Sequence, residues 1–216
     1  MMVRTDNGLM DWLVKERQLW SSGFLRVAGV DEAGRGPIAG PVVAAAVILP
    51  LGLDLPGVID SKLMTSRRRE EAYQLILECS LAVGISAVSS HNIDRIGILN
   101  AAMAAMRRAV LKLDPLPDFV LVDGNRYPAG LDLPGEAVVR GDRKCRSIAA
   151  ASVVAKVVRD RLMTKLDRLY PGYDFAGHKG YCTPQHRLQL ASMPPTPHHR
   201  LSFAPLRQRN LFPDDG

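Results

Sequence analysis

Two apolar segments near the start of the chain, joined by a glycine-rich turn, restrict the possible folds more than any other feature. Residues 26–33 (RVAGVDEA) have the apolar run of a buried strand, and residues 40–49 (GPVVAAAVIL) predict its antiparallel partner. Strand-like segments recur at 81–90, 119–123 and 136–139, with helical patterns between them. Strands that come first and then alternate with helices indicate an α/β protein with a mixed sheet flanked by helices.

The segments between these strands have helical periodicity. Thr65 or Ser66 is expected to cap a helix over residues 67–78. A second helical face has apolar residues at steps of three and four, namely Ile96, Leu99, Met103, Met106, Val110 and Leu113. A third, longer helix has an apolar face formed by Ile148, Ala151, Ala155, Val158, Leu162 and Leu166. Residues 1–24 predict an N-terminal helical extension of a body at 25–216, and a change in composition from about residue 171 predicts a C-terminal helical cap.

The composition is that of a folded protein, with 47% hydrophobic and 23% charged residues among 216. No segment approaches the roughly 18 apolar residues of a membrane-spanning helix. The charged N-terminal segment lacks the apolar stretch of a signal peptide. We therefore expect a cytoplasmic protein that works as a monomer without a membrane partner. The formal net charge of +6 favours a polyanionic partner.

Acidic residues end three of the strand-like segments. Asp31 and Glu32 end the first, Asp123 follows the run FVLV, and Asp142 follows EAVVRG. If the strand ends converge, the four carboxylates form a cluster whose repulsion Mg²⁺ or Mn²⁺ would relieve. The alternative is that acids commonly end strands before turns. Neighbours on a regular strand point to opposite faces, so one of the adjacent pair would need a second ion site, a twisted strand end or its backbone carbonyl.

The turn after the first strand contains the tripeptide Gly34-Arg35-Gly36. The glycines permit close approach of the backbone to a ligand and unusual φ angles, while Arg35 offers planar donors to phosphate or sugar oxygens. The alternative is an ordinary glycine turn with a solvated arginine. The tripeptide alone therefore favours neither interpretation.

The motifs taken together resemble those of ribonuclease HII, the bacterial type 2 ribonuclease H. The stretches GVDEAGRGPIAGPVVAAAVIL, DSK, LVDGN, GD followed by SIAAASVVAKVVRDR, and HKGYCT occur in the order of that family, from about residue 26 to 205. The resemblance implies an RNase H-like fold with a C-terminal helical extension, so that 25–216 would be a type 2 catalytic domain. It also implies cleavage of the RNA strand in RNA–DNA hybrids. Incision on the 5′ side of single ribonucleotides in duplex DNA, leaving 3′-hydroxyl and 5′-phosphate ends, is implied as well.

The resemblance also implies roles for individual residues. Asp31, Glu32, Asp123 and Asp142 would bind two metal ions about 4 Å apart, Mg²⁺ or Mn²⁺, for phosphodiester hydrolysis. Gly34, Arg35, Gly36 and Tyr181 would sense the ribose 2′-hydroxyl. Phosphates would be contacted by Lys62, Lys144, Arg146, Ser147 and Lys156. An intrahelical pair with Asp160 is the alternative for Lys156. Two departures from the family pattern are Cys182 after the tyrosine and Leu63 after DSK.

Other interpretations remain open at this stage. A nuclease with the same fold but a DNA substrate would share clustered acids without DEAGRGP and the C-terminal GY. A binding protein without turnover would lack one of the acids, and all four are present. Finally, QRNLF at Gln208 to Phe212 is similar to short peptides that bind bacterial sliding clamps, although a tail packed on the body is the alternative.

Overall fold

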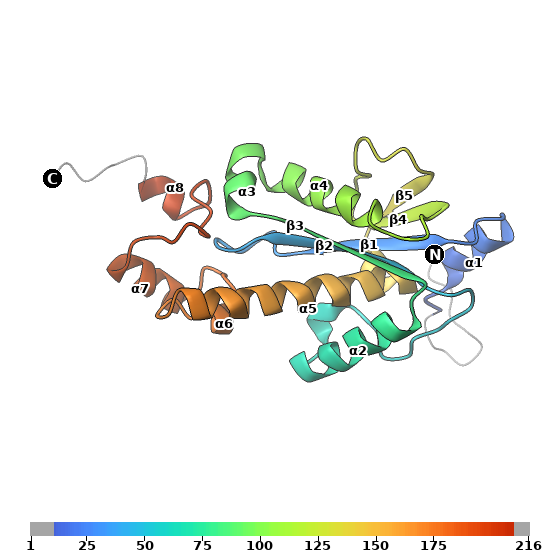
Figure 1. Cartoon of the computed structure of the whole chain (residues 1–216), viewed down its shortest axis with the longest axis horizontal. Coiled ribbons are helices and arrows are strands. Elements are labelled where there is room, and N and C mark those ends of the chain that lie inside the picture. The colour runs from blue at the N-terminus through green and yellow to red at the C-terminus, as the bar shows by residue number, and fades with distance from the viewer. Residues whose placement is uncertain (1–10, 210–216) are drawn as a thin grey trace.

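The computed structural model describes residues 11–209, and its centre is a five-stranded mixed sheet in the order β3-β2-β1-β4-β5 (Figure 1). The strands are β1 Val27–Ala33, β2 Val42–Ile48, β3 Ala82–Val88, β4 Phe119–Asp123 and β5 Gly135–Val138. The first two form an antiparallel pair, β2 also pairs with β3 antiparallel, and β1, β4 and β5 run parallel. This arrangement confirms the mixed α/β sheet and puts β1, which contains two of the four acids, at its centre.

Helices cover both faces of the sheet (Figure 1). The helices before residue 171 are α1 Val14–Ser21, α2 Ser66–Cys79, α3 Ser90–Ile96, α4 Ile98–Val110 and α5 Arg146–Leu169, with short 3₁₀ turns η1 Ser61–Leu63 and η2 Gly141–Arg143. One apolar core lies between the sheet and α4, and a second lies between the sheet, α5 and α2. The helices thus bury both sides of β1 and β2, which explains why these strands are almost wholly apolar.

Helix α5 approaches β1 unusually closely. A Cβ atom at Gly29 would overlap the backbone of Ser147 and Ile148 at the start of α5. Because only glycine leaves room for this contact, the position of α5 relative to the strand is tightly defined. The same helix contributes side chains to the site described below, so this contact helps to position that site.

The helical predictions are confirmed in part. Thr65 caps α2, and its hydroxyl accepts a hydrogen bond from the amide of Arg68 at 3.3 Å. The predicted helix with an apolar face beginning at Ile96 is wrong at its N-terminal end, because Ile96 belongs to a separate helix. Gly97, with φ of +79°, separates α3 from α4, and Ile96 is 42% exposed at the end of α3. A glycine in the left-handed region interrupts the helix although the spacing of apolar residues continues across it.

The N-terminal helix α1 is attached to the body through a buried acid. Glu16 is 2% exposed and accepts hydrogen bonds from the amide and hydroxyl of Ser147, at 3.0 and 2.8 Å. The first residues of a helix have unsatisfied amides and a partial positive charge, which a carboxylate stabilises. Since Cys145 provides no side-chain cap, Glu16 performs that function for α5.

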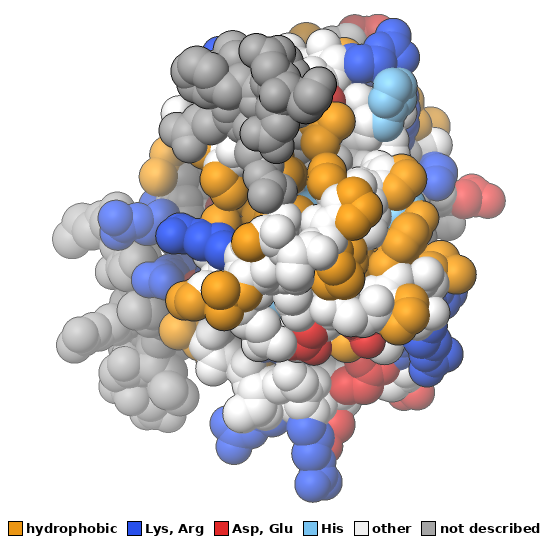
Figure 2. Space-filling model, turned by 90° about the vertical axis from the view of Figure 1, so that its left-hand side faces the viewer, with side chains coloured by type: hydrophobic (Ala, Val, Ile, Leu, Met, Phe, Trp, Pro, Cys, Tyr) orange, Lys and Arg blue, Asp and Glu red, His pale blue; other side chains and the backbone are white. Residues whose placement is uncertain are grey.

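The predicted C-terminal extension is helical and shares a small apolar core with Ile38, Ala39 and the end of α5. It contains α6 Phe175–His178, α7 Pro184–Ser192 and α8 Leu206–Arg209. Figure 2 shows the end of the molecule that carries α7, where apolar side chains gather among charged ones. Most of the predicted clamp peptide, from residue 210 to 212, lies outside the described residues. Within residues 11–209, no helix is long and apolar enough to cross a membrane.

Candidate active site

Two neighbouring parallel strands bring the acids to one edge of the sheet. Val30 of β1 is paired with Val122 of β4, so Asp31 and Asp123 occupy the next position on each strand. Asp142 does not end a strand as predicted; it lies in η2, four residues beyond β5. The turn is held against β4 because one carboxylate oxygen of Asp123 accepts the amides of Gly141 and Asp142, at 2.6 and 3.3 Å.

These strand ends line a hollow of about 490 Å³ in the surface. The predicted residues that line it are Asp31, Glu32, Asp123, Gly34, Arg35, Gly36, Lys62, Lys156 and Tyr181. Asp142 lies at its margin, with its carboxylate 3.8 Å from the ammonium of Lys62. Both members of the adjacent pair face this hollow although they are neighbours on β1. The structure therefore brings together residues that are up to 150 positions apart in the chain.

The acids repel one another in this arrangement. Burial raises the pKa of Asp31 well above its usual value, and the charges of Glu32 and Asp123 raise it further. Burial also raises the pKa of Glu32, although its ion pair with Arg35 at 3.1 Å opposes the shift. For Asp142, burial and the charge of Asp123 raise the pKa. The cluster thus has an excess of negative charge that a cation would stabilise.

The glycine turn and the tyrosine lie next to each other in the wall of the hollow. A Cβ atom at Gly36 would lie 3.8 Å from the ring of Tyr181, which is 47% exposed. Gly34 has φ of +97°, a conformation that favours glycine. The turn can therefore approach a ligand closely, and an accessible aromatic ring lies beside it.

Comparison with known proteins identifies the family. The model of the family described as Ribonuclease HII matches residues 28–206. The chain belongs to this family. A ribonuclease HII of Geobacter sulfurreducens is 52% identical over 186 residues, which are 86% of this chain and 85% of that protein.

Solved structures agree with the assignment. The ribonuclease H2 of Pyrococcus horikoshii is similar with a TM-score of 0.72 and 26% identity, over 85% of this chain and 96% of that one. The ribonuclease HII in the PCNA complex of Archaeoglobus fulgidus has a TM-score of 0.65 and 29% identity, over 78% and 88%. The predicted RNase H-like fold is confirmed. As a ribonuclease HII, the chain is a metal-dependent endoribonuclease of the RNase H type that acts on RNA–DNA hybrids.

Three of the predicted phosphate contacts do not reach the hollow. Arg146 is 4% exposed, donates to the carbonyl of Val58 and forms an ion pair with Asp54 at 2.6 Å. Ser147 is occupied by Glu16, as described above. Lys144 is exposed and donates to the carbonyl of Val139 at 2.6 Å. The start of a helix is a common phosphate site, but here α1 covers it, and sequence alone did not show that contact.

Other residues line or support the hollow without having been predicted from the sequence. Ser61, Ser152 and Arg159 line it, and the two serine hydroxyls are 2.8 Å apart. Asp60 is fully buried and accepts two hydrogen bonds from Arg143, at 3.0 and 3.2 Å. Asp60 and Ser61 stand in the DSK motif, which was a usable signal. Arg159 stands in the motif SIAAASVVAKVVRDR, but an arginine inside a helical pattern is usually exposed, so its burial was not expected.

The ribonuclease HII acids suit a hard divalent ion by their chemistry. They offer only carboxylate oxygens, the donors that Mg²⁺ and Mn²⁺ prefer, and they carry the excess negative charge described above. Within residues 11–209, however, no three His, Cys, Asp or Glu side chains are already arranged around a common point. The acids are thus close enough to repel one another, but their side chains do not yet converge on a single point where one ion could be coordinated. The unrelieved repulsion is the property that fits the site to a divalent ion.

Proposed function

We propose that the chain incises duplex DNA on the 5′ side of a single embedded ribonucleotide, in addition to acting on hybrids, and leaves 3′-hydroxyl and 5′-phosphate ends. The observation that carries the proposal is that three of the acids, Asp31, Glu32 and Asp123, share one hollow with the Gly34–Gly36 turn and Tyr181. A reacting phosphate beside the acids would then have its ribose within reach of the turn and the ring. Recognition of the 2′-hydroxyl and hydrolysis would occur on the same nucleotide.

Asp31, Glu32, Asp123 and Asp142 would hold the metal. Two bound divalent ions would supply an activated water and stabilise the leaving 3′ oxygen. Tyr181 would pack on the sugar, and Lys62 would place its ammonium against a phosphate oxygen. Burial lowers the pKa of Lys62, but the nearby carboxylates of Asp60, Asp31, Asp142 and Asp123 raise it on balance, so it remains a cation.

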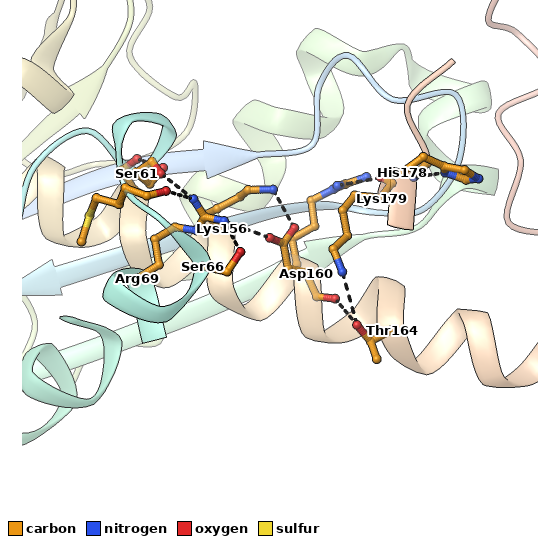
Figure 3. Close-up of polar contacts among 12 residues, drawn as sticks. Ser61, Ser66, Arg69, Lys156, Asp160, Thr164, His178 and Lys179 are labelled. Carbon is orange, nitrogen blue, oxygen red and sulfur yellow. Dashed lines mark hydrogen bonds and ion pairs between the residues drawn. The ribbon is translucent and has the colours of Figure 1, made fainter. Parts of the chain in front are cut away.

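A duplex is much larger than the hollow, so its backbone must continue over neighbouring surface. The α2–α5 groove, defined by Arg69, Glu70, Asp160, Arg161, Thr164, Lys165, Arg168 and Lys179, lies beside it. The two are joined by an ion pair of 2.7 Å between Lys156, which lines the hollow, and Asp160 (Figure 3). The groove has five cations and two acids, a balance that favours a phosphate backbone.

The test is an incision assay on matched duplexes that contain one ribonucleotide or none, with and without chelator. We expect a single cut on the 5′ side of the ribonucleotide when Mg²⁺ or Mn²⁺ is present, and none with chelator. All-DNA duplex should remain intact. Cutting of the all-DNA duplex would instead favour a DNA nuclease, and cutting of long hybrids alone would refute the proposed second substrate.

A sliding clamp is a second proposed partner, and the supporting observation is that a similar ribonuclease HII is described in complex with PCNA. The contact would be made by Gln208 to Phe212. Phe212→Ala should abolish capture by immobilised clamp and leave incision of free duplex unchanged. Equal capture of the two proteins would refute the contact.

We further propose that the protein acts in the cytoplasm as a monomer, with residues 1–24 as an extension of the catalytic domain at 25–216.

A further inference from the structure

We infer that two buried arginines, Arg200 and Arg159, are positioning residues that fix the glycine turn for ribose recognition. They bind the carbonyl groups of residues 34–41 from inside the protein, so that the amides of the turn are left for the substrate. The inference rests on the proposed function of this turn. It concerns two residues whose hydrogen bonds go to the protein backbone: Arg200, which is fully buried, and Arg159, which lies at the wall of the hollow.

Arg200 binds the turn through all three nitrogens of its guanidinium. Its guanidinium is fully buried and donates to the carbonyls of Gly34 at 2.6 Å and Arg35 at 3.0 Å. It also donates to Pro37 at 2.7 Å and twice to Gly40, at 2.8 and 3.0 Å. Five hydrogen bonds from one rigid group to four carbonyls determine the path of the backbone between them.

Arg159 extends the same arrangement from helix α5. It is 1% exposed and donates to the carbonyls of Ala39 at 3.2 Å and Pro41 at 3.1 Å. Its third hydrogen bond, at 3.1 Å, reaches the carbonyl of Lys179, two residues before Tyr181. A Cβ atom at Gly34 would overlap this side chain. Arg159 therefore fixes the turn and the tyrosine segment relative to each other and to α5.

The consequence is a separation of backbone donors from backbone acceptors. Among the described residues, none accepts a hydrogen bond from the amides of Gly34, Arg35 or Gly36, and the last two residues are exposed. Carbonyls directed inward and free amides beside a hollow form a surface that accepts anions and hydroxyl oxygens. Such a surface suits the phosphate and ribose of one nucleotide.

The charge of the two arginines is consistent with this role. Burial lowers the pKa of Arg200 to about 9, and the neighbouring Arg159 cation lowers it as well, yet the group stays charged at neutral pH. A buried cation is tolerated where hydrogen bonds compensate for lost water, and here the carbonyls do so. Both positive charges thus lie behind a turn that would receive a negatively charged backbone.

The test compares binding of two short duplexes that differ in one ribose, measured in chelator so that nothing is cleaved. Arg200→Lys keeps the charge but loses the planar set of donors. We expect the parent to prefer the duplex with the ribonucleotide, and Arg200→Lys to lose about tenfold of that preference. Its dissociation constant for all-DNA duplex should remain that of the parent. An unchanged preference in the folded variant would overturn the inference.

Two controls separate positioning from simple loss of stability. Met106→Ala creates a cavity in the core on the opposite face of the sheet and should destabilise the protein without changing the preference. If circular dichroism shows that Arg200→Lys is unfolded, the same binding comparison is made with Arg159→Lys. A loss of preference for the ribonucleotide supports the inference, and an unchanged preference overturns it. A parent without preference would refute the proposed ribose recognition itself, whereas a parent with preference and an unchanged variant would refute only the role of the arginines.

Discussion

Asp123→Asn should stabilise the protein while abolishing its activity. In the parent, one oxygen of Asp123 accepts the amides of Gly141 and Asp142, at 2.6 and 3.3 Å. Asparagine keeps an oxygen for both bonds and has nearly the same shape, so only the charge is removed. That charge raises the pKa of Asp31, after burial and Glu32, and contributes to the raised pKa of Glu32 and Asp142. Its removal therefore relieves repulsion on three neighbours.

The magnitude follows from Coulomb's law. At an effective dielectric constant of about 20, two carboxylates roughly 6 Å apart repel by about 3 kcal/mol before screening. Because the hollow is open to solvent and salt screens part of this repulsion, we expect a net gain in the free energy of unfolding of about 1–2 kcal/mol in chelator. Divalent ion should stabilise the parent by about 1.4 kcal/mol for each tenfold excess over its dissociation constant. The variant should lose most of that stabilisation.

Urea unfolding in chelator and in Mg²⁺, together with hybrid binding and cleavage, provides the assay. The expected result is a higher midpoint than the parent in chelator, a smaller response to Mg²⁺, retained hybrid binding and no cleavage. Asp118→Asn is the matched control, because this acid lies just before β4 and instead accepts the amides of Leu25 and Arg26. It should leave the Mg²⁺ response intact. A less stable Asp123→Asn protein in chelator, or one that cleaves normally, would refute the reasoning.

Close packing, the α2–α5 groove and two buried histidines provide further tests. Gly29→Ala should destabilise the fold by about 2–3 kcal/mol in urea, because the added methyl group overlaps the start of α5. Replacing both Lys165 and Arg168 with Ala should lower the slope of log affinity against log salt for long hybrids by about 2. Burial lowers the pKa of His186 and His199 from 6.5 to about 4. The unfolded chain then binds more protons in that range, so stability should fall as the pH drops from 6.5 towards 4, by about 1.4 kcal/mol per pH unit for each histidine.

Each of these tests has its own control. Gly52→Ala imposes an unfavourable positive φ without any close contact and should lose only about 1 kcal/mol; an equal loss at both glycines would contradict the overlap. Arg108→Ala removes an exposed cation from α4, on the other face of the sheet, and should leave the salt slope unchanged. His199→Gln should roughly halve the histidine contribution to the pH slope, and a slope equal to that of the parent would exclude this origin.

Sequence was sufficient for the features that depend on neighbouring residues or on strand order. The pairing of 26–33 with 40–49 and the Thr65 cap follow from local patterns, and both are observed. Asp31 and Asp123 meet because parallel strands end at one edge of the sheet, which apolar runs ending in acids already indicated. Asp142 was assigned to the cluster for the same reason, although it reaches the cluster through η2.

Features that depend on distant contacts could not be predicted. The family resemblance implied phosphate contacts for Arg146 and Ser147, but α1 covers this end of α5 through Glu16, which is 131 positions away from Ser147. Arg159 and Arg200 look like exposed cations in the sequence, yet both are buried among carbonyl groups. When the partners of a buried arginine are backbone carbonyls, no acidic residue in the sequence indicates that it is buried. The break at Gly97 was hidden because the apolar spacing continues across it.

The attachment of α1 has a practical consequence for anyone who shortens this protein. Deletion of the segment before β1 would strip the first turn of α5 of its carboxylate and leave the amide and hydroxyl of Ser147 without an acceptor. It would also uncover the guanidinium of Arg146, whose charge lies 4.9 Å from the ring of Trp12. Helix α5 carries Ser152, Lys156 and Arg159 into the hollow. A less firmly held N-terminal end of α5 would therefore shift these side chains and lower the activity indirectly. Trimmed versions should therefore begin upstream of residue 11.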